Sequence, residues 1–334
     1  MTPSSSEWLA QIDEAPLDPS REIVDPHHHL WPDGGALPYG VDDLVADTTS
    51  GHDIVATVFV ECHASYRVDG PLERRSLGET EFVASSADDL AVRHPHAAPI
   101  VGIVAGVDLT IDDLDDVLDA HVAAARGRLR GVRDALALSR EPAAHLIPGA
   151  NAAGKFEDPA FRRGVERLGE RALTYDSWHF HYQNHEFAAL ARAVPNTTMV
   201  LDHFGSPVAI GSDAGRHDEI FESWKHDIAE IAACPNTVAK LGGLAMPDNG
   251  FGFHEAGRPP TSDEFLAVQR RWYEHAIACF GPERCMFESN FPVDRFSLSY
   301  GTYWNAMKKL VADFSEPEQA TMFAGTARRV YSLD

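Results

Sequence analysis

The run Asp25-Pro26-His27-His28-His29 is the part of the sequence whose residue types point most directly to chemistry. In an extended strand, side chains two positions apart share a face, so Asp25, His27 and His29 align while His28 points away. Two imidazoles with this spacing can bind one divalent cation. A purification tag would stand at a terminus, and an internal run of three histidines favours a functional site over a His-rich turn. We therefore expect His27 and His29 to be metal ligands.

Polar side chains also end several of the other strands that the sequence predicts. Glu61 and His63 share one face at the end of the second, and Arg133 ends the fourth, where its planar guanidinium suits a substrate carboxylate. One histidine at a strand end is more often structural than catalytic, but barrel enzymes assemble their active sites from such ends. The residues predicted to bind substrate are Trp31, Glu61, His63, Arg133, His179, His181 and Lys240.

Short β-branched runs alternate with helical stretches along the chain, the pattern of βα units on a parallel sheet. The eight expected strands cover 22–25, 53–61, 99–107, 129–134, 172–178, 197–202, 237–242 and 284–289. The expected helices cover 78–94, 112–126, 218–233, 262–280 and 316–333. This α/β alternation favours a single (β/α)8 barrel over a doubly wound open sheet, because the Gly-rich phosphate turn after the first strand is missing.

Two segments fall outside this alternation. Residues 1–20 are polar and contain three prolines, so we expect a short N-terminal arm followed by one barrel domain over 21–334. Residues 245–261 are rich in glycine and proline and follow the seventh expected strand. At that place on a barrel they form a candidate lid or substrate loop.

The composition limits the classes of partner. The 334 residues carry 51 acidic against 28 basic side chains, a net charge of -23, which disfavours binding to nucleic acid or anionic lipid. No run approaches the ~18–20 apolar residues of a membrane-spanning helix, and the N-terminus lacks the features of a secretory signal. The four cysteines lack CxxC spacing and are expected to be reduced thiols in a cytoplasmic protein. We expect a small-molecule substrate, and a homodimer is compatible with the sequence.

An ordered set of segments resembles one enzyme family. The segments are IVDPHHHLW, LRGVRD, TYDSWHFHYQN, LDHFGSP, VAKLGGL, MFESNFPVD and FAGTARRVYSL, which together span residues 22–332. They resemble the amidohydrolase superfamily, in the amidohydrolase-related branch that includes fuconolactonase-type and pyrone-dicarboxylate-lactonase-type hydrolases. The resemblance implies a distorted TIM barrel and hydrolysis of a lactone or related carboxyl derivative.

The resemblance also implies roles for the strand-end histidines. In this superfamily the residues that match His27, His29 and His203 bind a divalent metal or, in some lactonases, the substrate carbonyl directly. The lysine that bridges two metals in other members has no counterpart, because Arg133 ends the fourth expected strand. The expectation is therefore one metal at most, Zn²⁺ or Mn²⁺, with a metal-free histidine site as the alternative.

The chain departs from the family pattern at the eighth expected strand. Related proteins usually read Gly-Ser-Asp-Trp-Pro there, whereas this chain has Glu288, Ser289 and Asn290 followed by Phe-Pro. The amide of Asn290 cannot take a proton from water, as the family's aspartate does. Our hypothesis is that Glu288 takes over proton handling or metal ligation while Asn290 orients water or substrate. Glu61 and Asp294 are rival carboxylates, and a buried structural partner for a barrel arginine or lysine is the alternative role for Glu288.

Three functions are compatible with these residues. The leading interpretation is a hydrolase that acts on a lactone or related cyclic ester of a small acidic metabolite, with His203, Glu288, Asn290 and Asp294 as candidate catalytic residues. A decarboxylase or hydratase is the second, because a lyase needs no activated water. A ligand-binding barrel without catalysis is the third. The aromatic residues that could wall the pocket, or equally pack the core, are Trp31, Tyr66, Trp178, Phe204 and Phe291.

Overall fold

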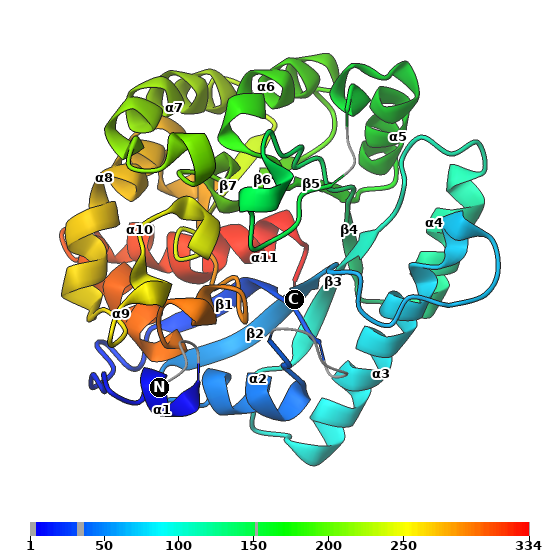
Figure 1. The fold of residues 1–334 in the computed structure, drawn as a ribbon. Helices are drawn as coiled ribbons and strands as arrows, with labels where there is room; N and C mark the ends of the chain where they lie inside the picture. Colours follow the sequence, from blue (N-terminus) through cyan, green and yellow to red (C-terminus); the bar gives the residue numbers. More distant parts are fainter. Residues whose placement is uncertain (1–4, 32–36, 151–152, 334) are drawn as a thin grey trace.

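The chain folds into a barrel of eight parallel strands in the order β1 to β8 (Figure 1). The computed structural model describes residues 5–31, 37–150 and 153–333. The strands are β1 (Glu22–His28), β2 (Asp53–Val60), β3 (Ile100–Gly106), β4 (Leu129–Arg133), β5 (Thr174–Ser177), β6 (Met199–Leu201), β7 (Thr237–Leu241) and β8 (Cys285–Phe287). The predicted (β/α)8 barrel and its eight strands are confirmed, and β1 runs three residues beyond its expected end at Asp25.

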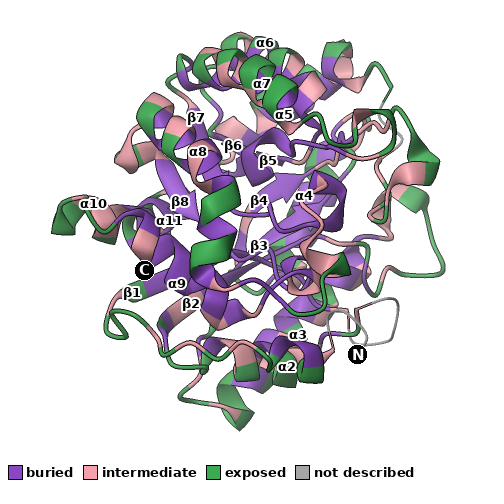
Figure 2. Cartoon of the chain, turned by 60° about the vertical axis from the view of Figure 1, so that its left-hand side comes forward, coloured by how far each residue is buried: buried purple, intermediate pink, exposed green. Residues whose placement is uncertain are grey.

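Helices surround the sheet, with their exposed faces outward and the strands buried inside them (Figure 2). They are α1 (Ser6–Leu9), α2 (Val41–Thr48), α3 (Leu77–Arg93), α4 (Leu114–Ala124), α5 (Pro159–Glu170), α6 (Asn184–Ala193), α7 (His217–Ala232), α8 (Ser262–Phe280), α9 (Tyr300–Leu310), α10 (Glu316–Ala320) and α11 (Thr326–Val330). The single helix expected over 316–333 is wrong, because a π-helical turn over Thr321–Gly325 separates α10 from α11.

The barrel closes between β1 and the residues that follow β8. The N–H of His29 donates to the carbonyl of Phe291 at 2.8 Å, and the N–H of Asn290 donates to that of His27 at 3.0 Å. The buried carboxylate of Asp25 reinforces this seam, because it accepts bonds from the N–H and hydroxyl of Ser289, at 3.0 and 2.6 Å. Burial raises the pKa of Asp25 to about 6 despite these bonds. The seam places the histidine run beside residues 288–290.

An apolar plug fills the lower part of the barrel and supports a polar layer above it. Val200, Val238 and Met286 belong to this plug. Side chains two positions apart on a strand share a face. The residues that therefore follow on the inner face, toward the carboxyl ends of the strands, are Asp202, Lys240 and Glu288.

The N-terminal arm lies against the barrel. Trp8 of α1 is buried, and its indole N–H donates to the carbonyl of Ala256 at 3.2 Å. The expected lid segment 245–261 contains two short 3-10 turns, Pro247–Asn249 and Phe253–Glu255. Within the described part of the chain, none of the helices combines the length and apolar character needed to cross a membrane.

A buried glutamate on α3 holds the loop after β2, which carries predicted site residues. The Oε1 atom of Glu79 accepts from the N–H groups of Cys62 and Ala64 at 3.0 and 2.7 Å. Burial and the nearby charge of Glu61 raise the pKa of Glu79 to about 8. The folded state therefore favours the neutral carboxylic acid.

This arrangement predicts a pH-dependent stability. A carboxyl whose pKa is higher in the folded state stabilises fully below its unfolded pKa, and this contribution is lost as the pH rises toward 8. In Glu79→Gln the amide oxygen can keep both bonds without a titrating group, so its unfolding free energy should fall less between pH 5.5 and 8.5, by at least ~1 kcal/mol. Urea denaturation measures both slopes. Glu73→Gln, at a half-buried position nearby, should follow the wild type, and equal slopes for Glu79→Gln and wild type would contradict the prediction.

Candidate active site

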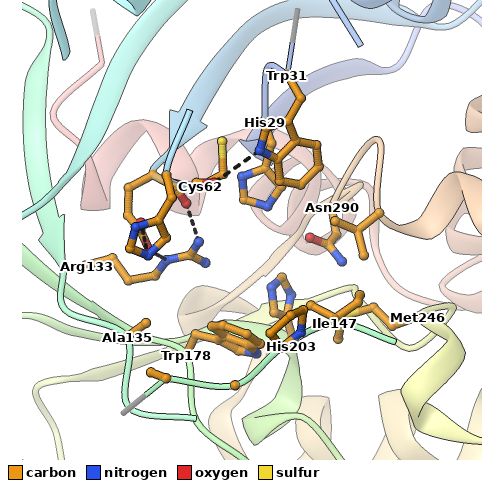
Figure 3. A pocket seen from close by; sticks show the side chains of 16 residues that line it. His29, Trp31, Cys62, Arg133, Ala135, Ile147, Trp178, His203, Met246 and Asn290 are labelled. Carbon is orange, nitrogen blue, oxygen red and sulfur yellow. Dashed lines mark hydrogen bonds and ion pairs between the residues drawn. The ribbon is translucent and has the colours of Figure 1, made fainter. Parts of the chain in front are cut away.

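A cavity of about 340 Å³ opens at the carboxyl ends of the strands (Figure 3). Its polar lining residues are His29, Glu61, His63, Arg133, His203 and Asn290. Trp31 and Trp178 lie on opposite sides of it in the view of Figure 3. Ile147, Met246 and Val293 add apolar surface. The cavity thus combines apolar walls with a few convergent polar groups, which is the usual composition of a small-molecule site.

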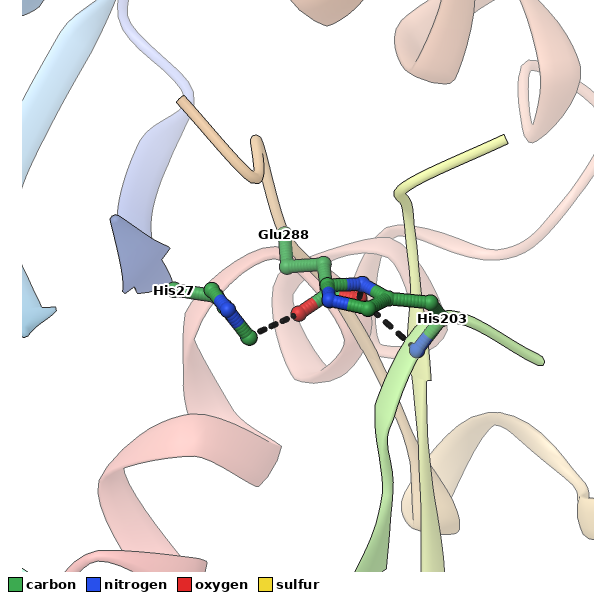
Figure 4. Close-up of side chains that lie close together, drawn as sticks. All are labelled: His27, His203 and Glu288. Carbon is green, nitrogen blue, oxygen red and sulfur yellow. Dashed lines mark hydrogen bonds and ion pairs between the residues drawn. The ribbon is translucent and has the colours of Figure 1, made fainter. Parts of the chain in front are cut away.

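Beneath this lining, Glu288 lies between two histidines (Figure 4). Its Oε2 is 2.8 Å from Nδ1 of His27, and its Oε1 is 2.7 Å from Nδ1 of His203. His27 comes from β1, His203 from the turn after β6, and Glu288 directly follows β8. His27 and Glu288 are fully buried, whereas His203 reaches the cavity.

Local backbone geometry makes this contact possible. His203 has a φ of 54°, in the left-handed region that few non-glycine residues occupy. Gly243 approaches it closely after β7, with a φ of +73°, and a Cβ at this position would collide with the His203 ring. A Cβ on Gly242 would likewise collide with Glu288. The glycine pair at the end of β7 thus makes room for both side chains.

The histidines predicted to bind metal come together in the structure. The ring of His27 lies with its centroid 4.9 Å from that of His29 and 4.5 Å from that of His203. The Nδ1 atom of His29 is 2.8 Å from the carbonyl oxygen of Val60, which can only accept a hydrogen bond, so Nδ1 donates. The Nε2 atom of His29 therefore carries the lone pair of its neutral ring.

These residues fit a divalent cation. Ligand atoms of His27, His203 and Glu288 all lie within 4.8 Å of one another, and Nε2 of His27 is buried without a hydrogen-bond partner. Burial, assisted by the charge of Lys240, lowers the pKa of His27 well below its usual value, and burial with Arg133 does the same for His29. Both rings are thus held in the neutral form that ligates metals.

A chain of buried charges runs below and beside the histidines. The ammonium of Lys240 is 2.8 Å from Asp176, 3.2 Å from Asp202 and 3.3 Å from Nδ1 of His27. Arg133 continues the chain, at 3.4 Å from Asp202 and 2.7 Å from Glu61. Burial opposes ionisation of Asp202, but Lys240 and Arg133 together lower its pKa.

The pairing of Arg133 changes what this residue offers to a ligand. Its guanidinium donates to Oε1 of Glu61 and also to the backbone carbonyl of Glu61, and it is 5% exposed. The charge expected to anchor a substrate carboxylate is thus already balanced inside the protein.

The remaining predicted site residues fall into two groups. Trp31, Glu61, His63 and Asn290 line the cavity, and the amide of Asn290 donates to Asp294 at 2.9 Å. Burial raises the pKa of Asp294, which lies behind Asn290, to about 7.

Two predicted histidines and Lys240 lie outside the cavity lining. The ring nitrogens of His179 face Ser177 and Asn184, and Nδ1 of His181 accepts from the N–H of Val208. They lie elsewhere because β5 ends at Ser177 and the chain turns before them, so the alternation of a strand no longer applies.

Three of the five aromatic side chains considered as pocket walls also lie outside the cavity lining. Phe204 packs against Tyr273, and Phe291 packs against Tyr300. Tyr66 lines an adjoining cavity instead.

Several lining residues carried no signal in the sequence. Ala135, Pro148, Gly149 and Ala150 follow β4 without hydrophobic periodicity or a chemical motif. Cys62 was assigned only as a reduced thiol. Met246 lies at the start of the Gly- and Pro-rich segment 245–261, whose composition did indicate a substrate loop.

Comparisons with known proteins agree with this architecture. An uncharacterized protein of Sinorhizobium fredii, y4mH, is 30% identical over 332 residues, covering 93% of this chain and 98% of that protein. An L-fucono-1,5-lactonase of Burkholderia multivorans is 28% identical over 262 residues, covering 78% of each. A crystal structure of a Burkholderia multivorans amidohydrolase with bound zinc has a TM-score of 0.73 at 25% identity, covering 93% of this chain and 99% of that one.

A protein-family model described as an amidohydrolase matches residues 24–333. This range includes every strand but the first two residues of β1, together with all the residues of the candidate site. The resemblance inferred from the sequence is confirmed, and the protein belongs to the amidohydrolase family.

Proposed function

We propose that the protein hydrolyses a lactone of a small hydroxy acid in the cavity above His27, His29 and His203. The observation that carries this proposal is the convergence of these three rings at the floor of an apolar-walled cavity. The similarity to an L-fucono-1,5-lactonase supports the choice of lactones as the first substrate class to test.

His27, His29 and His203 would hold one divalent metal, Zn²⁺ or Mn²⁺. Such an ion, when bound, polarises a carbonyl and lowers the pKa of bound water. Asn290, on the cavity wall, orients the lactone or the water through its amide, whose position is fixed by the bond to Asp294. Asp294 is the buried carboxyl group best placed to receive a proton through this contact. Trp31 and Trp178 flank the bound ring and exclude water from its apolar edges.

The charge balance of the cavity favours an uncharged lactone over one that bears carboxylates. Arg133 is paired with Glu61 and Asp202, and His29 is neutral. A substrate carboxylate would have to displace Glu61 from Arg133, at the cost of leaving that glutamate buried and unpaired. An uncharged ring with hydroxyl groups can instead donate to Glu61 without disturbing the pair.

The first prediction concerns activity and metal together. Wild-type protein should open L-fucono-1,5-lactone or a related neutral sugar lactone, with acid release followed by a pH indicator and with oxygen from solvent in the product. The double variant His27→Gln/His29→Gln should lose bound metal, measured by mass spectrometry, and about 10²–10³ in kcat, the range for loss of a group that stabilises developing charge. His52→Gln, at a buried histidine bonded to Lys308, should keep both properties.

Other outcomes would identify the alternative functions. Release of CO₂ from a carboxylated substrate would indicate the lyase. Thermal stabilisation by a lactone without any turnover would indicate the ligand-binding barrel. Either result would contradict the hydrolase.

The second prediction tests the charge balance. Glu61→Gln removes the carboxylate that neutralises Arg133, so it should raise kcat/KM for a carboxylated lactone relative to a neutral lactone by about tenfold, equivalent to ~1.4 kcal/mol. The matched control is Glu73→Gln, which removes the same charge from the adjoining cavity without releasing Arg133. A wild-type preference for the carboxylated lactone, or an equal shift in both variants, would overturn this account of specificity.

A further inference from the structure

The carboxylate of Glu288 contacts two imidazoles through the same ring atom of each. Oε2 is 2.8 Å from Nδ1 of His27, and Oε1 is 2.7 Å from Nδ1 of His203, while the N–H of His203 also donates to Oε1 at 3.2 Å. Glu288 is 0% exposed, so no solvent competes for these contacts. One side chain thus occupies the Nδ1 side of both rings.

These contacts are hydrogen bonds and not the edges of a shared metal site. Zinc bonds to nitrogen and oxygen are about 2.0–2.2 Å long, and two ligands of one tetrahedral zinc lie about 3.3 Å apart. Separations of 2.7 and 2.8 Å are those of charge-assisted hydrogen bonds. Glu288 therefore acts on the rings of His27 and His203 from behind.

An ionised carboxylate has only acceptors, so each Nδ1 must be the donor. The ammonium of Lys240, 3.3 Å from Nδ1 of His27, supplies a positive charge beside the carboxylate. With its proton on Nδ1, a neutral imidazole keeps its lone pair on Nε2. His29 is held in the same form by the carbonyl of Val60.

We propose that Glu288 is a positioning residue that locks His27 and His203 in the Nδ1–H tautomer and so presents both Nε2 lone pairs to one cation. Gly242 and Gly243 support this assignment independently, because a Cβ on either would collide with Glu288 or with the His203 ring. The end of β7 is shaped around the three-residue contact. This inference deepens the proposed function, but it concerns the metal-free protein and is tested there without turnover.

The test is the tautomer of each ring in full-length, metal-free protein. Long-range ¹H–¹⁵N correlation spectra of ¹⁵N-histidine-labelled protein distinguish Nδ1–H from Nε2–H, and the variants His27→Gln and His203→Gln assign the signals. In the wild type, His27, His29 and His203 should all carry the proton on Nδ1. Either His27 or His203 in the Nε2–H form would overturn the proposal, and this measurement needs no variant of Glu288.

Glu288→Gln provides the second arm. The glutamine side chain offers one acceptor and one donor, so at least one of His27 and His203 should shift to the Nε2–H form or to exchange between forms, while His29 stays unchanged. Glu79→Gln, the same substitution at another buried glutamate, should leave all three signals in place. Unchanged tautomers in Glu288→Gln would contradict the proposal.

Zinc affinity gives an independent readout, by competition with a chromophoric chelator. Loss of a group that orients metal-bound histidines typically lowers metal affinity 10–100-fold, and we expect this loss in Glu288→Gln but not in Glu79→Gln. An affinity within twofold of the wild type would count against the proposal. If the tautomers are as expected but no lactone is hydrolysed, the proposed function fails while the role of Glu288 stands.

Discussion

The buried ammonium of Lys240 is the charge around which the interior of the barrel is organised. It is 0% exposed and lies within 3.3 Å of side chains from three other strands or strand ends, Asp176, Asp202 and His27. Burying a single ion costs several kcal/mol, and removing one partner of a buried pair typically costs about 3–5 kcal/mol. These strands therefore have to meet with their carboxylates in place, and the polar layer of the site inherits that precision.

The formal charges of this layer do not cancel. Lys240 and Arg133 face the carboxyl groups of Glu61, Asp176, Asp202 and Glu288, two cations against four acids. One divalent cation would balance that excess at the place where the histidine rings converge. A neutral ring with its proton on Nδ1 cannot donate from Nε2, so the arrangement around Glu288 suits a cation better than direct donation by imidazoles to a carbonyl oxygen. The metal-dependent and metal-free hypotheses thus differ in the position of a proton.

Some of these features follow from the sequence and others depend on three-dimensional closure. Alternation along a strand is local, so the inward direction of His27, Lys240 and Glu288 could be predicted from spacing alone. The partner of Arg133 could not, because a long side chain inside a barrel pairs with whichever carboxylate the closed sheet brings near it. His179 was predicted to face the site because β5 was expected to continue to residue 178, whereas it ends at Ser177.

Turn geometry set a second limit. The left-handed φ of His203 arises in a 3-10 turn over Asp202–Gly205, and the position of its ring depends on Gly243 from another strand. The loop residues 147–150 reach the cavity without any periodic pattern that would place them there. Sequence reasoning therefore identified the floor of the site more completely than its walls.

The closure of the barrel also bears on how the protein is made. The seam joins β1 to residues 289–291, and the hydroxyl of Tyr331 donates to Asp176 beside Lys240. Ribosomes release a chain from its amino terminus, so the histidine run emerges about 260 residues before the strand end that completes its surroundings. Until Tyr331 has left the exit tunnel, the central ammonium lacks part of its final environment. The site is thus a late product of synthesis, assembled only when both ends of the barrel are free to meet.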